Sequence, residues 1–367
     1  MSNILGRAHR GKRSPLLVGA VVLAVLATAA CSAVDATDSP TTDSDTAAVA
    51  VGIDLGLFAD GAIVGEPETV DCSLSGGVET TCYKFATSGY PETYEVGPFC
   101  PDTTTTSADD AGIWFDGDAL YDIDGEFIAN LAETYGDDGW HMYDQDGNVY
   151  VTETIEAFEG AARPDVDPAY QNYCIEGSLD FLDNGEPIES TVTIPVTPVL
   201  ADAAAESSGN SGNSGNSGIT LDGIVIAASA PVNAILGAYT IASFDNCGGH
   251  FNPFEGYHLH GALGCGENGD AREGETAIFG YAMDGFAVHS AYTEEELANA
   301  ELDQCNGHTT EEDGYHYHAN VPEKNRVIEC LVGQTVAGGD EAGGGPPAGG
   351  APGDASAGGP PTEEPNE

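Results

Sequence analysis

Six histidines of this 367-residue chain occupy matched positions in two short segments: His250, His258, His260, His308, His316 and His318. In each segment the last two are separated by one residue, which puts both side chains on the same face of a β-strand. Two imidazoles on one face can chelate a metal ion, and the first histidine of each segment supplies a third nitrogen. Neutral imidazole suits Zn, Cu, Ni or Fe, and three nitrogens leave one coordination position open. The spacing predicts a transition-metal site, with Zn or Cu favoured.

The two segments are copies of one repeat. The first spans 245–260 and the second, 58 positions later, spans 303–318. Both read Asp-x-Cys-x-Gly-His, five further residues, and then Gly-Tyr-His-x-His. Eight identical positions at one spacing indicate an internal duplication.

The duplication extends upstream of the histidines in a looser form. The segment 218–224 resembles 280–286, and a cysteine follows each histidine segment. We therefore expect two repeats, over about 218–265 and 280–330. Each is predicted to be a strand, an Asp-Gly turn, a second strand and a Cys/His segment, and the two to pack around a pseudo-twofold axis.

Three interpretations of the histidines remain open. They bind metal, or they hydrogen-bond backbone carbonyls as a structural network, or they act in metal-free acid–base catalysis. With metal, Asp245, Asp303 or nearby tyrosine hydroxyls would orient or complete the site.

The corresponding functions are equally open. The chain would be a metal-binding protein, a metal-dependent hydrolase or redox enzyme, or a metal-free structural or adhesion protein. An open ligand position in a pocket beside Asp284 or His289 favours the enzyme, whereas a closed, fully ligated site favours binding. Hydrogen-bonded histidines that do not converge favour the structural role.

Short apolar runs separated by Asp-Gly and Asn-Gly pairs give the chain a β-rich pattern. Such pairs favour tight hairpin turns because they tolerate positive φ. They occur at 124–125, 146–147, 184–185, 222–223 and 284–285. Segments 191–196 and 224–226 are predicted strands, and 126–135 and 293–302 are predicted helices, the second with a Thr-x-x-Glu capping box. The predicted fold is mainly β with a few short helices, disulfide-tied, with an internally duplicated C-terminal β unit.

The segment 314–318, which reads Gly-Tyr-His-Tyr-His, resembles the signature of the YHYH protein family. The neighbouring Cys-Asn-Gly-His and the segment 280–286 are also similar to that family. The first copy differs, because Leu259 stands where the second tyrosine would be. The resemblance implies an exported protein with a YHYH domain, predicted over 191–336 after a β-rich region over 51–190, and it implies no particular activity.

The N-terminus resembles a bacterial export signal followed by a cysteine that carries lipid. Four basic residues precede an apolar run that ends at Cys31, and at about 15 residues this run is shorter than the ~20 of a membrane span. We expect a signal peptide over 1–31, lipidation of Cys31, a disordered tether over 32–50 and a disordered Gly/Pro tail over 337–367. The protein would be exported and anchored in the cell envelope, with the lipid membrane as partner; the sequence names no protein partner.

Eight further cysteines suggest four disulfides, because the compartment outside the cytoplasm is oxidising. Local pairing predicts these bonds: Cys72–Cys82, Cys100–Cys174, Cys247–Cys265 and Cys305–Cys330. The chain has 61 acidic and nine basic residues, a formal net charge of −52. Such a surface repels the phosphates of nucleic acid and attracts cations. We therefore expect no nucleic-acid partner.

Overall fold

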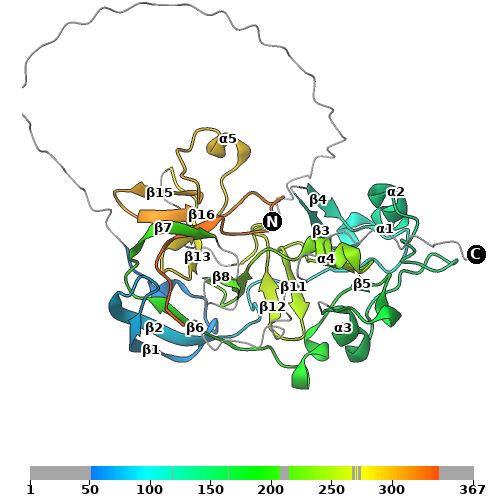
Figure 1. Cartoon of the computed structure of the whole chain (residues 1–367), viewed down its shortest axis with the longest axis horizontal. Helices are drawn as coiled ribbons and strands as arrows, with labels where there is room; N and C mark the ends of the chain where they lie inside the picture. Colours follow the sequence, from blue (N-terminus) through cyan, green and yellow to red (C-terminus); the bar gives the residue numbers. More distant parts are fainter. Residues whose placement is uncertain are drawn as a thin grey trace, which may run out of the picture. The chain divides into compact units, whose positions relative to one another are not determined.

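An eight-stranded sheet carries the duplicated part of the chain (Figure 1). The computed structural model describes residues 51–338 apart from 118, 164, 207–214, 267–268, 270 and 272–273, all of them within one unit, Thr46–Glu367. The strands follow one another in the order β11 (Gly249–Asn252), β12 (Gly256–Leu259), β9 (Val225–Ala227), β8 (Asn216–Thr220), β13 (Ile278–Ala282), β14 (Ala287–His289), β16 (Gly314–His318) and β15 (Gly307–Thr310).

The middle of this sheet is the antiparallel pair β8–β13. Ile219 of β8 lies opposite Tyr281 of β13, and these residues hold the same position in the aligned segments 218–224 and 280–286. Outward from this pair, the order β9, β12, β11 on one side is repeated as β14, β16, β15 on the other. The β9–β12 and β14–β16 pairs are both parallel. The strand order therefore has the local twofold symmetry predicted for the repeats.

Asp-Gly turns join the inner strands of each repeat, as predicted at 222–223 and 284–285. Gly223 and Gly285 have φ angles of +76° and +89°, a region that glycine enters without steric cost. A Cβ on Gly223 would lie 2.4 Å from the Ala62 carbonyl oxygen. The tight turn and the close approach of the backbone both require glycine there.

A three-stranded antiparallel sheet from the N-terminal region packs on the middle of the large sheet. Its order is β1 (Ile63–Ser73), β2 (Glu79–Thr87) and β6 (Ser190–Pro195). Phe85 and Ile194 from this sheet share one apolar cluster with Ile219 and Tyr281. Full burial of such a side chain contributes about 1.5–3 kcal/mol. Because β6 pairs with β2, the regions before and after residue 190 share a core.

Three two-stranded ladders and five short helices complete the described part of the chain. The ladders are β3 (Ile113–Asp116) with β4 (Ala119–Asp122), β5 (Cys174–Ile175) with β10 (Ile241–Ala242), and β7 (Leu200–Glu206) with β17 (Cys330–Gly333). The helices are α1 (Gly125–Ala129), α2 (Leu131–Tyr135), α3 (Ile155–Ala161), α4 (Val232–Gly237) and α5 (Glu294–Leu297). The short 3-10 helices are Leu55–Leu57, Ala108–Asp110, Pro168–Tyr170, Leu179–Phe181 and Asp183–Gly185. The fold is mainly β with a few short helices, as the sequence predicts.

Both predicted helices are shorter than their sequence pattern. The segment 126–135 is two helices, since Asn130 between them has φ −103° and ψ 6°; an asparagine side chain competes for backbone hydrogen bonds and disfavours helix interiors. The second prediction, 293–302, is reduced to the four residues of α5. Its capping box forms, but it buries no side chain, and a helix without tertiary packing does not extend.

Two of the predicted hairpin turns were wrong. Asp124 is instead the N-cap of α1, where its carboxylate accepts a hydrogen bond from the Phe127 amide. The pair at 184–185 has positive φ at both residues, +61° and +67°, as a tight turn requires, but it does not lie between paired strands. Aspartate and asparagine serve caps and turns by the same local hydrogen bonds, so the dipeptide alone does not separate these structures.

The four disulfides join the local partners expected from the sequence: Cys72–Cys82, Cys100–Cys174, Cys247–Cys265 and Cys305–Cys330. The last two close the Cys/His segment of each repeat. Among the described residues, no helix is long and apolar enough to cross a membrane. The predicted signal peptide over 1–31, Cys31, the tether over 32–50 and nearly all of the predicted tail lie outside the described residues.

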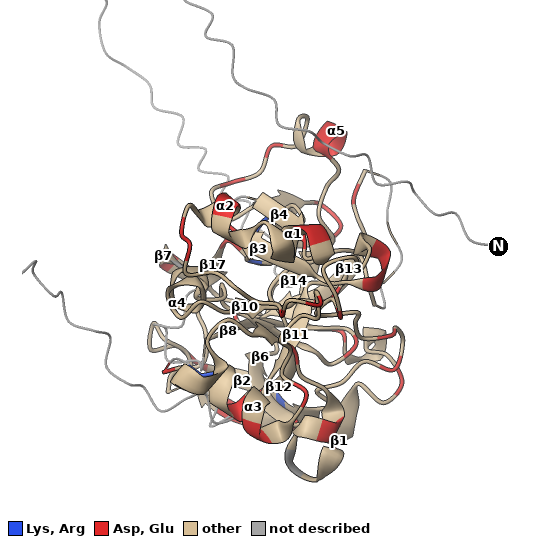
Figure 2. Ribbon diagram, turned by 90° about the vertical axis from the view of Figure 1, so that its right-hand side faces the viewer, with Lys and Arg blue, Asp and Glu red and all other residues tan. Residues whose placement is uncertain are grey.

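Acidic side chains lie along the surface elements. Figure 2 shows them on α3, α5 and β1, with few basic residues among them. Two ion pairs that involve arginine are Arg163–Asp165 and Arg326–Glu329, both on exposed or half-exposed side chains. Exposed pairs of this kind contribute about 0–1 kcal/mol each. The charge therefore affects cation attraction and solubility more than the fold.

Candidate metal centres

The histidines of the first repeat converge on one point. His250 lies on β11 directly opposite His258 on β12, and His260 follows β12 on the same face as His258. One nitrogen from each ring lies within 4.8 Å of the others, and His258 and His260 are buried. The strand period of two and the antiparallel register bring the three imidazoles together.

Hydrogen bonds fix the tautomers of two of these rings. Nδ1 of His258 lies 3.0 Å from the Gly256 carbonyl oxygen, and Nδ1 of His260 lies 2.6 Å from that of Ala228. A carbonyl only accepts, so both Nδ1 atoms carry the proton and both Nε2 atoms are unprotonated; Nε2 of His258 lies 3.1 Å from Nε2 of His250. Hydrogen bonds made by the ring nitrogen that does not bind the metal orient histidine ligands in metal sites.

Burial keeps this triad neutral. Desolvation lowers the pKa of His250, His258 and His260, and the charge of neighbouring histidines lowers it further for His250 and His260. Neutral imidazole is the form that binds metal. The first triad is therefore held in its ligand form.

The second repeat builds the same triad from equivalent residues. His308 on β15 lies opposite His316 on β16, and His318 ends β16. Their Nε2 atoms are close: 2.9 Å from His308 to His316 and 3.2 Å from His308 to His318. Nδ1 of His316 faces the Gly314 carbonyl at 3.2 Å, and Nδ1 of His318 faces the Ser290 carbonyl at 3.3 Å. Gly314 and Ser290 correspond to Gly256 and Ala228 of the first repeat, so the same two backbone contacts orient both triads.

A carboxylate joins the second triad only. Oε2 of Glu275 lies 3.3 Å from Nε2 of His308 and 3.4 Å from Nε2 of both His316 and His318. The Tyr292 hydroxyl donates to the same oxygen at 2.9 Å, and the Tyr292 ring stacks on His318 with centroids 3.9 Å apart. Three nitrogens and one oxygen therefore meet in the second repeat, and Tyr292 positions two of the four groups.

The pKa shifts in the second group favour the forms that bind metal, which are neutral imidazole for the histidines and ionised carboxylate for Glu275. Burial, with the charges of His316 and His289, lowers the pKa of His318 to about 3, and burial also lowers that of His316. Burial raises the pKa of Glu275, but the Tyr292 hydrogen bond and the nearby histidines outweigh it and lower the pKa overall. At neutral pH the Glu275 carboxylate is anionic and the His316 and His318 rings are neutral.

Hydrogen bonds among the rings and Glu275 do not by themselves account for the convergence of the four ligand atoms in the second group. With Nδ1–H fixed on His316 and His318, both Nε2 atoms are acceptors, and a single Nε2–H on His308 has three acceptors within 3.3 Å. The Nε2–H group of His308 can point a well-aligned hydrogen bond at only one of these three acceptors. A cation at the centre satisfies all four ligand atoms together. The structure thus contains two separate His-based groups that could hold a metal ion, with the four strands β9, β8, β13 and β14 between β12 and β16.

The aspartates shared by the two repeats support the loops and do not join the ligand groups. Asp245 accepts hydrogen bonds from the amides of Cys247 and Gly249 and from the Tyr257 hydroxyl. Asp303 accepts from Cys305, Gly307 and Tyr315 in the same way. The predicted role of these aspartates in completing a site is not seen. Part of the motif is therefore a structural network that holds the strand pair carrying the histidines.

The second tyrosine of the signature has a structural contact in this chain. The Tyr317 hydroxyl donates to Asp284 at 2.5 Å and accepts from the Val332 amide at 2.7 Å. The first copy has Leu259 at this position and lacks the contact. Tyr317 thus joins β16 to the β13–β14 turn and to β17.

His289 lies beside the second triad without entering it. Its Nδ1 donates to the Thr276 carbonyl at 2.6 Å, and its ring packs on His316 with centroids 4.3 Å apart. Burial lowers its pKa to about 4. His141 is exposed and faces the Gly139 carbonyl, away from both groups. Glu275 and Tyr292 were not predicted from the sequence, because neither has a motif around it and Glu275 is one of 61 acidic residues.

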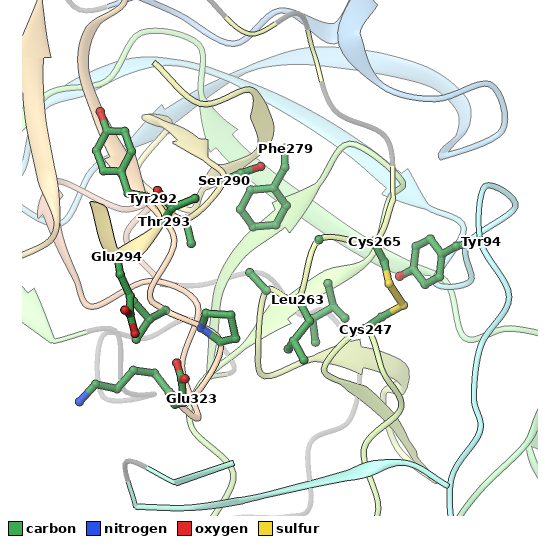
Figure 3. A pocket seen from close by; sticks show the side chains of 17 residues that line it. Tyr94, Cys247, Leu263, Cys265, Phe279, Ser290, Tyr292, Thr293, Glu294 and Glu323 are labelled. Carbon is green, nitrogen blue, oxygen red and sulfur yellow. A yellow bond between two sulfur atoms is a disulfide. The ribbon is translucent and has the colours of Figure 1, made fainter. Parts of the chain in front are cut away.

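The two groups differ in their surroundings. All three histidines of the first triad line a cavity of about 410 Å³. A second cavity, of about 660 Å³, is lined by residues of both repeats, including Ser290 and Tyr292, but by none of the four ligand residues of the second group. Figure 3 shows Tyr292 on one side of this cavity and the Cys247–Cys265 disulfide on the other. The first triad lines a cavity, whereas in the second group the Tyr292 ring packs on His318 and the His308 side chain stays 21% exposed.

A comparison with known families matches part of the chain. The YHYH protein family model matches residues 191–301. This chain contains a YHYH domain. The match includes the first triad and Glu275. It ends before His308, His316 and His318, so the histidines of the second centre lie outside the matched residues. No curated protein and no solved structure matched the chain.

Proposed function

We propose that this protein binds two transition-metal ions through its YHYH domain, one in each repeat. The observation that carries the proposal is the convergence of the Nε2 atoms in each triad while the opposite Nδ1 atoms of four of the six rings face backbone carbonyls. This arrangement frees the lone pairs for a metal and fixes their direction.

Zinc or copper fits these ligands best. Three imidazoles and a carboxylate match the nitrogen and oxygen ligands of tetrahedral zinc, and imidazole also suits copper. In the second centre the four ligands come from Glu275, His308, His316 and His318. A site with four protein ligands leaves no position for substrate, so we assign it to metal retention.

We also propose that the protein acts in the cell envelope, as a metal-binding lipoprotein. The basic and apolar N-terminus that ends at Cys31 supports export and lipidation. The four disulfides support an oxidising compartment. The strong negative charge would concentrate cations near the surface.

The test is equilibrium dialysis of the purified, chelator-treated full chain against Zn²⁺ and, separately, Cu²⁺. We expect two tightly bound ions per chain. His258→Ala and His316→Ala should each bind one, and His141→Ala, which lies outside both groups, should bind two. Binding of no metal by a folded parent chain would refute the proposal, as would variants that retain both ions.

A further inference from the structure

The two centres are chemically unequal although their histidines are equivalent. The second has a carboxylate as fourth ligand and the Tyr292 ring packed against it. In the first, no carboxylate from the described residues joins His250, His258 and His260. These three rings instead form part of the wall of the cavity of about 410 Å³. A metal held there would have a coordination position that faces the cavity.

The cavity has the size and lining of a small-molecule site. Pockets of about 300–1,000 Å³ with mainly apolar walls and few polar groups are typical of such sites. Its walls include Ala161 at the end of α3, Ala234 and Ile235 of α4, and Ala227 and Phe251 of the large sheet. The equivalent side of the second centre is occupied by Tyr292 and His289.

The charged groups in the wall already have partners within the protein. Arg163 pairs with Asp165 at 2.8 Å, and Glu255 accepts from the Asn252 side chain at 2.8 Å. Asn216 also lines the cavity, and its side-chain oxygen is buried with no hydrogen-bond partner among the described residues. The wall therefore favours an uncharged ligand.

We propose that the first centre is the ligand-binding centre of the domain. A small, uncharged, mainly apolar molecule with one lone-pair donor binds the metal held by His250, His258 and His260 and fills the cavity beside α4. This inference rests on the proposed metal binding. It assigns the two repeats different roles: the second retains its ion with four protein ligands, and the first, with three, presents its ion to a ligand.

The test uses the purified full chain loaded with Co²⁺, and 4-phenylimidazole as probe. The probe has a nitrogen lone pair, an N–H and an apolar ring. We expect it to change the visible absorption of bound Co²⁺ and to bind at least about tenfold more tightly than imidazole, because its phenyl ring is buried in the cavity. His316→Ala should keep this response, and His258→Ala should lose it.

A pair of helix variants tests the cavity without touching a ligand. Ala234→Phe places a ring in the cavity wall and should weaken 4-phenylimidazole by about tenfold or more, with both cobalt ions retained. Asn233→Phe is the matched control on the same exposed helix outside the lining, and it should bind the probe like the parent.

The outcomes separate the two proposals. A chain that takes up no cobalt refutes both. If the chain binds two cobalt ions, three results overturn the ligand-binding inference while metal binding stands. The probe causes no spectral response, or the response is lost in His316→Ala and not in His258→Ala. The third is that the two helix variants bind the probe with equal affinity.

Discussion

Replacing Asp284 with asparagine is expected to change how the stability of the protein depends on pH. This carboxylate is fully buried, and it accepts hydrogen bonds from the Tyr317 hydroxyl and from the amides of Gly333 and Phe286. Burial raises its pKa from 3.8 to about 6, against the opposing effect of these hydrogen bonds. The folded protein therefore binds a proton at this side chain at pH values where the unfolded chain has released it.

The sign and size of the effect follow from linkage. A carboxyl with a raised pKa in the folded state contributes its full stability below the unfolded pKa and loses it as pH rises through the folded pKa. At 1.36 kcal/mol per pKa unit, the shift to about 6 makes the free energy of unfolding about 3 kcal/mol lower at pH 7 than at pH 3, with most of the change between pH 4 and 6. Asparagine has no such titration.

The assay is urea denaturation of parent and Asp284→Asn from pH 4 to pH 7.5, in chelator, with the difference between the two proteins taken at each pH. The difference removes the titration of the many other acidic residues. We expect the parent to lose about 2 kcal/mol relative to the variant as the pH rises from 4 to 7. A constant difference across this range, or one that favours the parent at higher pH, would refute the reasoning about this buried carboxylate.

Three further predictions concern the second centre, its disulfide and the anchor. Tyr292→Phe removes the hydroxyl that positions Glu275 and should weaken metal binding at the second centre at least about tenfold, measured by chelator competition; unchanged affinity would mean that Glu275 needs no such support. Changing Cys305 and Cys330 together to serine opens a loop with a sequence separation of 25 and should lower the free energy of unfolding by about 3 kcal/mol, measured by urea denaturation with dithiothreitol-free buffer; equal midpoints would contradict this. Cys31→Ala should move the exported protein from the membrane fraction to the soluble fraction on detergent phase partition, and retention in the detergent phase would exclude lipid attachment at this cysteine.

The positions of the histidines could be predicted because they depend on local rules. His258 and His260 share a face through the strand period of two, and the repeat gives the same arrangement to His316 and His318. The pairing of His250 with His258 needs only a hairpin of the observed length. The duplication also predicted a twofold relation between the repeats, which the strand order shows.

The remaining parts of the site depend on contacts between distant segments. Glu275 comes from the loop before β13 and has no counterpart in the described part of the first repeat, so neither spacing nor repetition identifies it. The cavity of the first centre is formed by α3, α4 and the sheet, which meet only in the folded chain. The break at Asn130 has a different cause: it reflects a local preference of asparagine that the apolar periodicity of 126–135 did not reveal.

Anomalous diffraction from crystals of the metal-loaded protein, recorded on both sides of the zinc or copper absorption edge, tests the central claim most directly. We predict two separate peaks per chain. One should lie within about 2.0–2.1 Å of Nε2 of His250, His258 and His260, and the other at a similar distance from the ligand atoms of the second group. A single peak shared by the repeats, peaks at other residues, or no peak in crystals grown with excess metal would contradict the proposal of one metal ion in each repeat.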